Sequence, residues 1–174
     1  HMPALIDAGI SSFKIEGRMK SAYYTAVVTN AYRAVIDSYI KDKERYAFDS
    51  CWLRELDSVS HREYCTGYYF DLPSENAQTC TMPGYLREKS YLAVCRGYDG
   101  ASGLAKFEQR NKVKVGDPVE IISPGLPGRG FTVERMTDSA GNPVESAPHP
   151  FMEFFISMPF AVGEGDILRS AERE

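Results

Sequence analysis

Residues 11–21 read SSFKIEGRMKS, and this stretch decides how the first third of the chain is interpreted. Phe13 and Ile15 alternate with polar residues, which predicts a strand over residues 11–16. Gly17 ends that strand, and a helical pattern begins almost at once. Strand, turn and helix in this order form the half-module of α/β barrels, yet no second such unit follows. We therefore interpret the stretch as the end of a larger barrel.

Charged residues gather at the carboxyl end of this predicted strand, namely Glu16, Arg18 and Lys20. In α/β barrels the chemistry lies at the carboxyl ends of the strands, so in an intact barrel these side chains would face the active-site mouth. An ordinary cluster of solvated charges at a strand–helix junction is the alternative.

Three helices are expected in the first 60 residues. The first spans residues 3–8. The second runs over residues 21–43, and its apolar face repeats at helical spacing through Tyr24, Val28, Ala31, Val35 and Tyr39. The third covers residues 50–58, begins at good capping residues, and has an apolar face of Trp52, Leu56 and Val59.

From Tyr91 onward the sequence changes to short apolar segments separated by turn residues such as YDGASG and SPGLPG. Strands are expected near residues 91–98, 104–110, 118–123, 130–137, 143–147, 151–158 and 167–170. Six or seven strands in about 80 residues are typical of a small closed barrel or sandwich. The predicted fold class is α+β, with an α/β-barrel remnant (3–73), a linker (74–88) and a small all-β barrel (89–174).

The composition limits the function. The 174 residues are 43% hydrophobic, enough for a packed core, and carry a net charge of −4. This charge disfavours a surface that coats nucleic acid uniformly, but it leaves room for a local basic stripe. No run of about 18 apolar residues occurs, so no membrane partner is expected.

The four cysteines are spread evenly along the middle of the chain, at Cys51, Cys65, Cys80 and Cys95. They include no close pair of the CxxC type that zinc sites use, and no secretory leader is visible. Reduced thiols, no bound metal and a cytoplasmic location are therefore expected, with a metal site or disulfides as the less favoured alternatives.

Two stretches have the composition of a binding surface. SHREYCTGYYF (60–70) interleaves aromatic residues with a cation, as base-stacking platforms do; its candidates are Arg62, Tyr64, Thr66 and Tyr68. The favoured alternative is an aromatic plug that seals two parts of the protein together. KFEQRNKVKVGD (106–117) places basic residues at alternate positions, where they would share one face and contact phosphates: Lys106, Arg110, Lys112 and Lys114. A solvated sheet face interrupted by Glu108 is the favoured alternative there.

Hydrolytic chemistry has little support in the residues. Neither HExxH nor GxSxG occurs, and no acid pair stands out. His149 lies between prolines in APHP, which indicates a rigid turn rather than a general base. Cys65 is the least implausible nucleophile, but no motif places His61 beside it. We expect this chain to be non-catalytic by itself, and leave open whether the parent protein is an enzyme.

Taken together, these motifs resemble one known family. AGISSFKIEGRMKSAYYTAVVTNAYRAVID (8–37) is similar to the signature of the collagenase-like peptidase family, peptidase family U32. SHREYCTGYYF is similar to a later element of that family, although Cys65 stands where the family commonly has a hydroxyl residue. The stretches FEQRNKVKVGDPVEII, APHP and GDILR are similar to its C-terminal barrel domain.

The resemblance implies an α/β-barrel body followed by a small β-barrel like the second domain of translation elongation factors. Some family members carry a protease or collagenase label without agreed proteolytic residues. Others take part in hydroxylation of tRNA, ribosomal RNA or a quinone, activities associated with an iron–sulfur cluster held by cysteines in the body. This chain begins too late to include that body, so no cofactor is expected in it.

The expected function is that of a C-terminal accessory domain that binds a polymer substrate or a partner, RNA or polypeptide, while the body does the chemistry. An autonomous peptidase that cleaves collagen-like polypeptides is the enzyme alternative, and a pure protein-interaction module is the third. Residues 1–43 lack the neighbours that a barrel would supply, which would expose Val28 and Val35. We therefore expect them to form a homodimer or to fold back onto the Trp52 helix.

Overall fold

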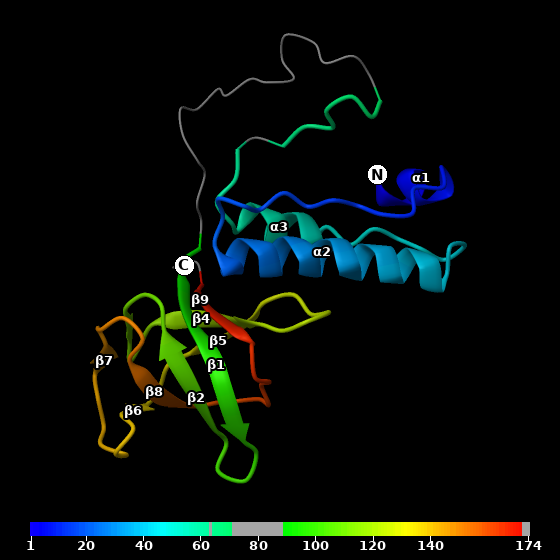
Figure 1. The fold of residues 1–174 in the computed structure, drawn as a ribbon. Helices are drawn as coiled ribbons and strands as arrows, with labels where there is room; N and C mark the ends of the chain where they lie inside the picture. The colour runs from blue at the N-terminus through cyan, green and yellow to red at the C-terminus, as the bar shows by residue number, and fades with distance from the viewer. Residues whose placement is uncertain (63, 71–88, 172–174) are drawn as a thin grey trace.

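The computed structural model describes residues 1–62, 64–70 and 89–171. Helices and the chain's first stretch form one part of the molecule, and strands form the other (Figure 1). The predicted linker (74–88) lies outside the described residues, which resume at Lys89. The proposed boundaries between barrel remnant, linker and β domain therefore stay a prediction.

Three helices form where the sequence pattern predicts them: α1 (Met2–Asp7), α2 (Ala22–Lys41) and α3 (Cys51–Asp57). Helix α2 begins at Ser21, whose side chain accepts a hydrogen bond from the Tyr24 amide and so satisfies one of the free amides of the first turn. It ends when Asp42 adopts an extended conformation, two residues before the predicted end.

The predicted strand over residues 11–16 is wrong. This stretch is an irregular extended segment that runs beside α2 (Figure 1). A strand exists through hydrogen bonds to a neighbouring strand, and none of the described residues pairs with this segment. Phe13 and Ile15 are instead half-buried, and Ile15 packs against the apolar cluster formed by α2.

Seven strands form one antiparallel sheet in the order β5-β4-β9-β1-β2-β8-β6. The strands are β1 (Tyr91–Asp99), β2 (Leu104–Gln109), β4 (Pro118–Ile122), β5 (Arg129–Thr132), β6 (Met136–Thr137), β8 (Glu153–Ser157) and β9 (Ile167–Ser170). A second, two-stranded sheet pairs β3 (Val113–Lys114) with β7 (Ser146–Ala147). Every predicted strand after residue 90 therefore contains at least one observed strand, although the expected strand over 130–137 divides into β5 and β6.

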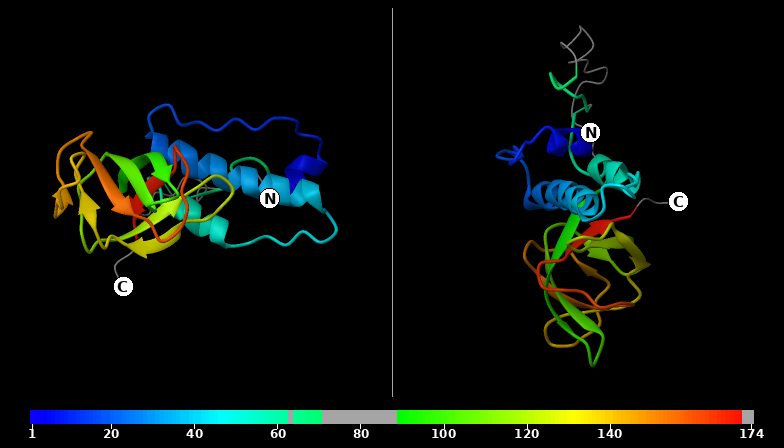
Figure 2. Two further views of the ribbon diagram at one scale, coloured as in Figure 1. Left: turned by 90° about the horizontal axis from the view of Figure 1, so that it is seen from below. Right: turned by 90° about the vertical axis from the view of Figure 1, so that its right-hand side faces the viewer.

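The sheet curls round on itself, and the helices gather on one side of it (Figure 2). The ladder of paired strands ends at β5 and β6, so within the described residues the sheet is a curled, open one rather than a fully closed barrel. Its interior is filled by apolar side chains with no exposed surface, including Phe107, Phe154, Ile121 and Leu168. The rings of Phe107 and Phe154 stack at 5.8 Å between centroids.

A second apolar cluster joins the helices to the sheet. Tyr23, Val27 and Val28 of α2 pack against Ile122 and Ile167 at the ends of β4 and β9. The buried face of α2 also includes Ala31, Val35 and Tyr39, as predicted, but Tyr23 replaces Tyr24 at its start. Val28 and Val35 are thus covered within this chain rather than left exposed.

Helix α2 packs on α3, which carries Trp52. Of the two arrangements expected for residues 1–43, this is the one in which they fold back onto the Trp52 helix. The cover also comes from the sheet, which sequence reasoning did not anticipate. The homodimer stays a prediction, because a single chain does not test it.

Candidate functional site

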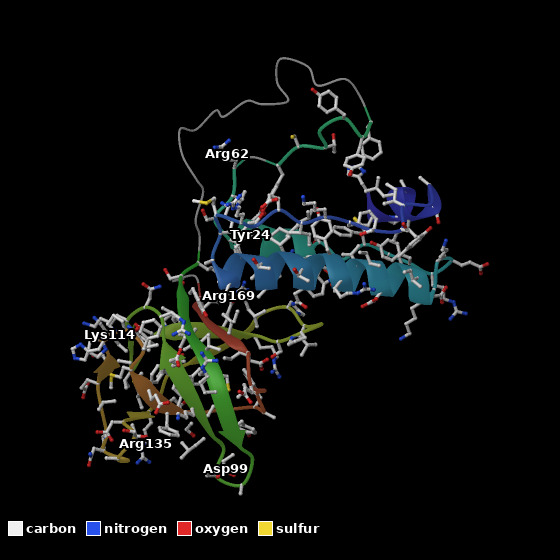
Figure 3. The ribbon with its side chains drawn as sticks, in the orientation of Figure 1. Tyr24, Arg62, Asp99, Lys114, Arg135 and Arg169 are labelled. Carbon is white, nitrogen blue, oxygen red and sulfur yellow. The ribbon has the colours of Figure 1, made fainter. Side chains whose placement is uncertain are left out.

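A buried ionic cluster lies where the helices meet the sheet. Arg169 of β9 is only 1% exposed, and Figure 3 places it between the sheet and α2. Its Nη1 lies 2.7 Å from Oε2 of Glu55 on α3, and its Nε donates to Oε2 of Glu120 on β4 at 2.7 Å. Nη1 also donates to the Ser58 hydroxyl at 2.8 Å. One guanidinium therefore binds a residue of α3, the residue that follows α3 and a residue of β4 at once.

The charges of this cluster balance. Lys89 Nζ lies 2.9 Å from Oε1 of Glu120, so two cations face two carboxylates. Burial alone would raise the pKa of Glu55, but hydrogen bonds from Arg169 and from the Gly128 amide, together with the Arg169 charge, lower that pKa overall. Such a satisfied cluster fixes how the two parts sit together and presents no charge to a ligand.

Next to the cluster, a cleft of 530 Å³ opens between the two parts. The helical part and the sheet part both line it, with Lys20, Tyr24 and Ser60 from the first and Lys89, Tyr91 and Asn111 from the second. A concave site where two structural units meet, with a few polar groups on aromatic walls, is where ligands commonly bind. We take this cleft as the centre of the candidate site.

Lys20 is the one member of the predicted barrel-mouth set that lines this cleft. Its Nζ donates to the Ser60 carbonyl at 2.7 Å and lies 5.2 Å from the centroid of the Tyr24 ring. Glu16 and Arg18 are exposed outside the cleft, where the Glu16 carboxylate accepts a hydrogen bond from the Arg18 amide at 2.9 Å. The structure therefore does not bring the three predicted residues together.

The aromatic stretch at 60–70 divides into a packed half and an exposed half. Tyr64 stacks on the buried ring of His61, with centroids 4.4 Å apart, and its hydroxyl donates to the Leu56 carbonyl at 2.8 Å. Burial is the main cause that raises the pKa of Tyr64. Tyr68 is 79% exposed, and Arg62 and Thr66 are also exposed. Tyr64 therefore packs on His61 although it is 54% exposed, and a ligand role for all four candidates stays a prediction.

The predicted basic stripe begins on the outer face of β2. Lys106 and Arg110 alternate with buried residues, and each has an acidic neighbour: Lys106 lies 2.6 Å from Glu153, and Arg110 lies 2.5 Å from Glu108. Lys112 and Lys114 are exposed beyond the strand end, and neither side chain forms an ion pair with the residues that the structure describes. The stripe therefore has a neutralised half and an uncompensated half.

Asn111 connects this uncompensated half to the cleft. Its side chain donates to the Tyr91 carbonyl at 2.6 Å, and the amides of Arg110 and Asn111 both donate to the Leu92 carbonyl. These bonds hold the turn after β2 against β1. Because Asn111 lines the cleft, Arg110 and Lys112 stand on either side of a cleft residue. Asn111 thus links the cleft to the basic residues along the chain.

The described cysteines lie in three separate parts of the fold. Cys51 is half-buried at the start of α3, Cys65 is exposed, and Cys95 is buried in β1 with its thiol directed at the Gly97 carbonyl. All three are free thiols, and Cys80 lies outside the described residues. Within the described ranges no group of three or more His, Cys, Asp or Glu side chains is placed to hold a metal ion.

Sequence reasoning missed the central cluster entirely. Arg169, Glu55 and Glu120 are far apart in the chain, and only an arginine beside the apolar pair of GDILRS hinted at a buried charge.

Among the described helices, none combines the length and the hydropathy needed to cross a membrane.

Comparisons with known proteins identify the family of this chain. The model of peptidase family U32 matches residues 1–79, and that of the peptidase family U32 C-terminal domain matches residues 87–169. The tRNA hydroxylation protein P1 of Bacillus subtilis is 35% identical over 149 residues, which cover 86% of this chain and 35% of that protein. A collagenase of Porphyromonas gingivalis is 28% identical over 121 residues, covering 69% of this chain and 34% of that protein.

Among solved structures, the C-terminal domain of a U32 peptidase of Geobacillus thermoleovorans aligns with a TM-score of 0.45 and 26% identity. That alignment covers 47% of this chain and 99% of the other. The chain spans about a third of the length of the curated relatives it matches. Two models of one family, in order along the chain, match most of its residues, and the chain belongs to peptidase family U32.

Proposed function

We propose that this chain is the RNA-binding, non-catalytic C-terminal part of a U32-family protein that takes part in tRNA hydroxylation. The observation that carries the proposal is the cleft between the helices and the sheet, which Lys20 and Asn111 line; the exposed cations Lys112 and Lys114 follow Asn111 in the chain. Local positive charge on a chain with a net charge of −4 is the arrangement expected of a site for a polyanion.

The relatives support RNA over polypeptide as the polymer. Proteins named for tRNA hydroxylation match 86% and 91% of this chain in Bacillus subtilis and Escherichia coli. Aromatic rings in the cleft, Tyr24 and Tyr91, add surfaces on which unpaired bases could stack. A protein that acts on tRNA would work in the cytoplasm, which is part of the same proposal.

Two finer expectations belong to the proposal as well. The curled sheet would close into a barrel like the second domain of translation elongation factors if β5 and β6 met. An iron–sulfur cluster, if the parent protein uses one, would be held by cysteines of the barrel body, as the resemblance to the family implies.

Peptidase activity is the alternative function, and the relative named collagenase favours it. In the described residues, however, the histidines are poorly placed for a thiol mechanism. His61 is buried, with Nδ1 2.7 Å from the Val59 carbonyl, and His149 is exposed in a turn. A general base must reach the nucleophile's proton, and among the described residues no contact joins His61 or His149 to a cysteine thiol; His61 Nε2 instead lies 3.8 Å from Oδ1 of Asp57.

A tRNA titration at two salt concentrations, about 50 and 200 mM, tests the proposal on the chain as it stands. We expect binding that weakens steeply with salt and no cleavage of gelatin or casein. Lys20→Gln should weaken binding, whereas Lys41→Gln, at the far end of α2 and about 28 Å along the helix axis, should not. Salt-independent binding, or gelatin cleavage abolished by a single Cys or His substitution, would contradict the proposal.

A further inference from the structure

Phe151 has a backbone conformation that its residue type disfavours. Among the described residues it is the one non-glycine with a positive φ, at 61°. A bulky aromatic residue in this left-handed region is an outlier that persists only when its surroundings enforce it. Its side chain gains no burial in return, because Phe151 is 68% exposed. Burial of the side chain therefore does not explain the positive φ of Phe151.

Hydrogen bonds to the end of β2 enforce this conformation. The Phe151 amide donates to the Gln109 carbonyl at 3.1 Å, and the Gln109 amide donates to the Met152 carbonyl at 3.0 Å. The Met152 amide closes a turn onto the His149 carbonyl at 3.1 Å. The buried side chain of Gln109 also donates to the Ala147 carbonyl, just before that turn. The turn that carries Phe151 is thus tied to β2 at several points.

Arg110 places a positive charge over the Phe151 ring. Its guanidinium carbon lies 4.9 Å from the ring centroid, within the range of a cation–π contact. The guanidinium is itself held by Glu108 at 2.5 Å and donates to the Gln109 carbonyl at 3.2 Å. The ring keeps most of its surface open although the guanidinium covers part of it. The result is a rigid, exposed aromatic surface with a cation on it.

The surroundings of this pair are basic. Arg110 is followed by the cleft residue Asn111 and by the uncompensated Lys112 and Lys114. Lys114 pairs with Ser146 of β7, the strand that leads into the turn carrying Phe151. Figure 3 shows Lys114 at one end of the sheet, well away from Asp99 and Arg135. Two exposed lysines thus follow Arg110 closely in the chain, and the strand of Lys114 pairs with the strand that precedes the Phe151 turn.

We propose that Phe151 and Arg110 form a stacking platform for one unpaired base of the bound RNA, whose neighbouring phosphates contact Lys112 and Lys114. Aromatic side chains interleaved with cations are how proteins bind single-stranded RNA segments. This inference rests on the proposed function and deepens it: the substrate is recognised through a single-stranded segment rather than through a duplex. Asn111, the residue after Arg110, links this platform to the cleft.

The test uses a short single-stranded oligoribonucleotide with one 2-aminopurine base, whose fluorescence falls when the base stacks. We expect quenching on binding to the unaltered protein and to Phe151→Trp. Phe151→Leu, which keeps the apolar bulk and the same backbone strain, should lose the quenching and bind about 5- to 150-fold more weakly. Its salt slope should stay unchanged, because every cation that meets a phosphate is still present.

Phe151→Gly separates binding from folding. Glycine accepts a positive φ, so this variant should unfold at a higher urea concentration than the unaltered protein and yet lose the quenching. If the unaltered protein binds the oligoribonucleotide and Phe151→Leu binds it equally well, the platform is wrong while the proposed function stands. If the unaltered protein binds neither the oligoribonucleotide nor tRNA, the proposed function fails and the platform fails with it.

Discussion

Two charged regions of this protein lie at opposite extremes of burial. In the Arg169 cluster every charge is paired, Arg169 and Glu55 are buried and Glu120 and Lys89 are half-buried, and the cluster ties α3 to β4 and β9. Lys112 and Lys114 are exposed, and neither side chain forms an ion pair with the described residues, although the Asp117 carboxylate accepts a hydrogen bond from the Lys114 amide. The comparison teaches that arginine and lysine content alone says little about function. Burial and pairing decide whether a cation holds the fold or meets a ligand.

The largest effect is expected from Arg169→Leu. This change leaves Glu55 and Glu120 buried without their shared partner, and breaking a buried ion pair on one side typically costs about 3–5 kcal/mol. The free energy of unfolding in urea should fall by about that amount. Arg135→Leu, an exposed position on the same sheet part, should change it by less than about 0.5 kcal/mol. Equal effects of the two changes would show that the cluster does not hold the parts together.

Gly128 lies against the Arg169 cluster and offers a second test of how tightly that cluster is packed. A Cβ at this position would overlap Arg169 Nη2 and would lie 2.6 Å from Glu120 Oε2, too close for either group to stay in place. Gly128→Ala should therefore cost about 1–3 kcal/mol of unfolding free energy. Gly130→Ala is the matched control, because its Cβ would meet only the Val119 carbonyl at an ordinary 3.9 Å. A Gly128→Ala variant as stable as Gly130→Ala would contradict the observed packing.

Acid should weaken the buried cluster. The pKa of Glu55 is lowered in the folded protein, so its contribution to stability is present above the pKa of the unfolded chain. It is lost as the pH falls through the lower, folded pKa. Urea unfolding between about pH 7 and pH 3 should therefore show a larger loss for the unaltered protein than for Glu55→Gln. If the unfolding free energy of the two proteins fell equally with pH, Glu55 would not be the group that makes the cluster sensitive to acid.

The elements that depend on local pattern were predictable from the sequence. Helix α2 begins beside the predicted first residue, Ser21, and the apolar spacing of Val28, Ala31 and Val35 identified its buried face. Turn residues such as those in YDGASG separated the strands of the sheet correctly. The strand predicted at 11–16 failed because alternation describes a face, whereas a strand needs a partner that sequence alone does not supply.

The candidate site was predictable only in its separate pieces. The charges of Lys20 and of the stretch from Lys106 to Lys114 marked them as candidates. The sequence did not reveal that one cleft brings Lys20 and Asn111 together. The Arg169–Glu55 pair joins residues 114 positions apart, which no local spacing reveals. Phe151 was predicted to begin the strand over residues 151–158, but it lies in a turn before β8, and its strained backbone is visible only in the structure.

The salt dependence of tRNA binding tests the central claim most directly, through a charge-matched pair of double variants. In Lys112→Gln/Lys114→Gln the slope of log binding constant against log salt should become shallower by about one for each phosphate that loses its lysine, with stability unchanged. In Lys41→Gln/Arg135→Gln, which removes the same charge from exposed positions away from the cleft, the slope should stay that of the unaltered protein. Equal slopes for all three proteins would contradict the assignment of this surface to RNA.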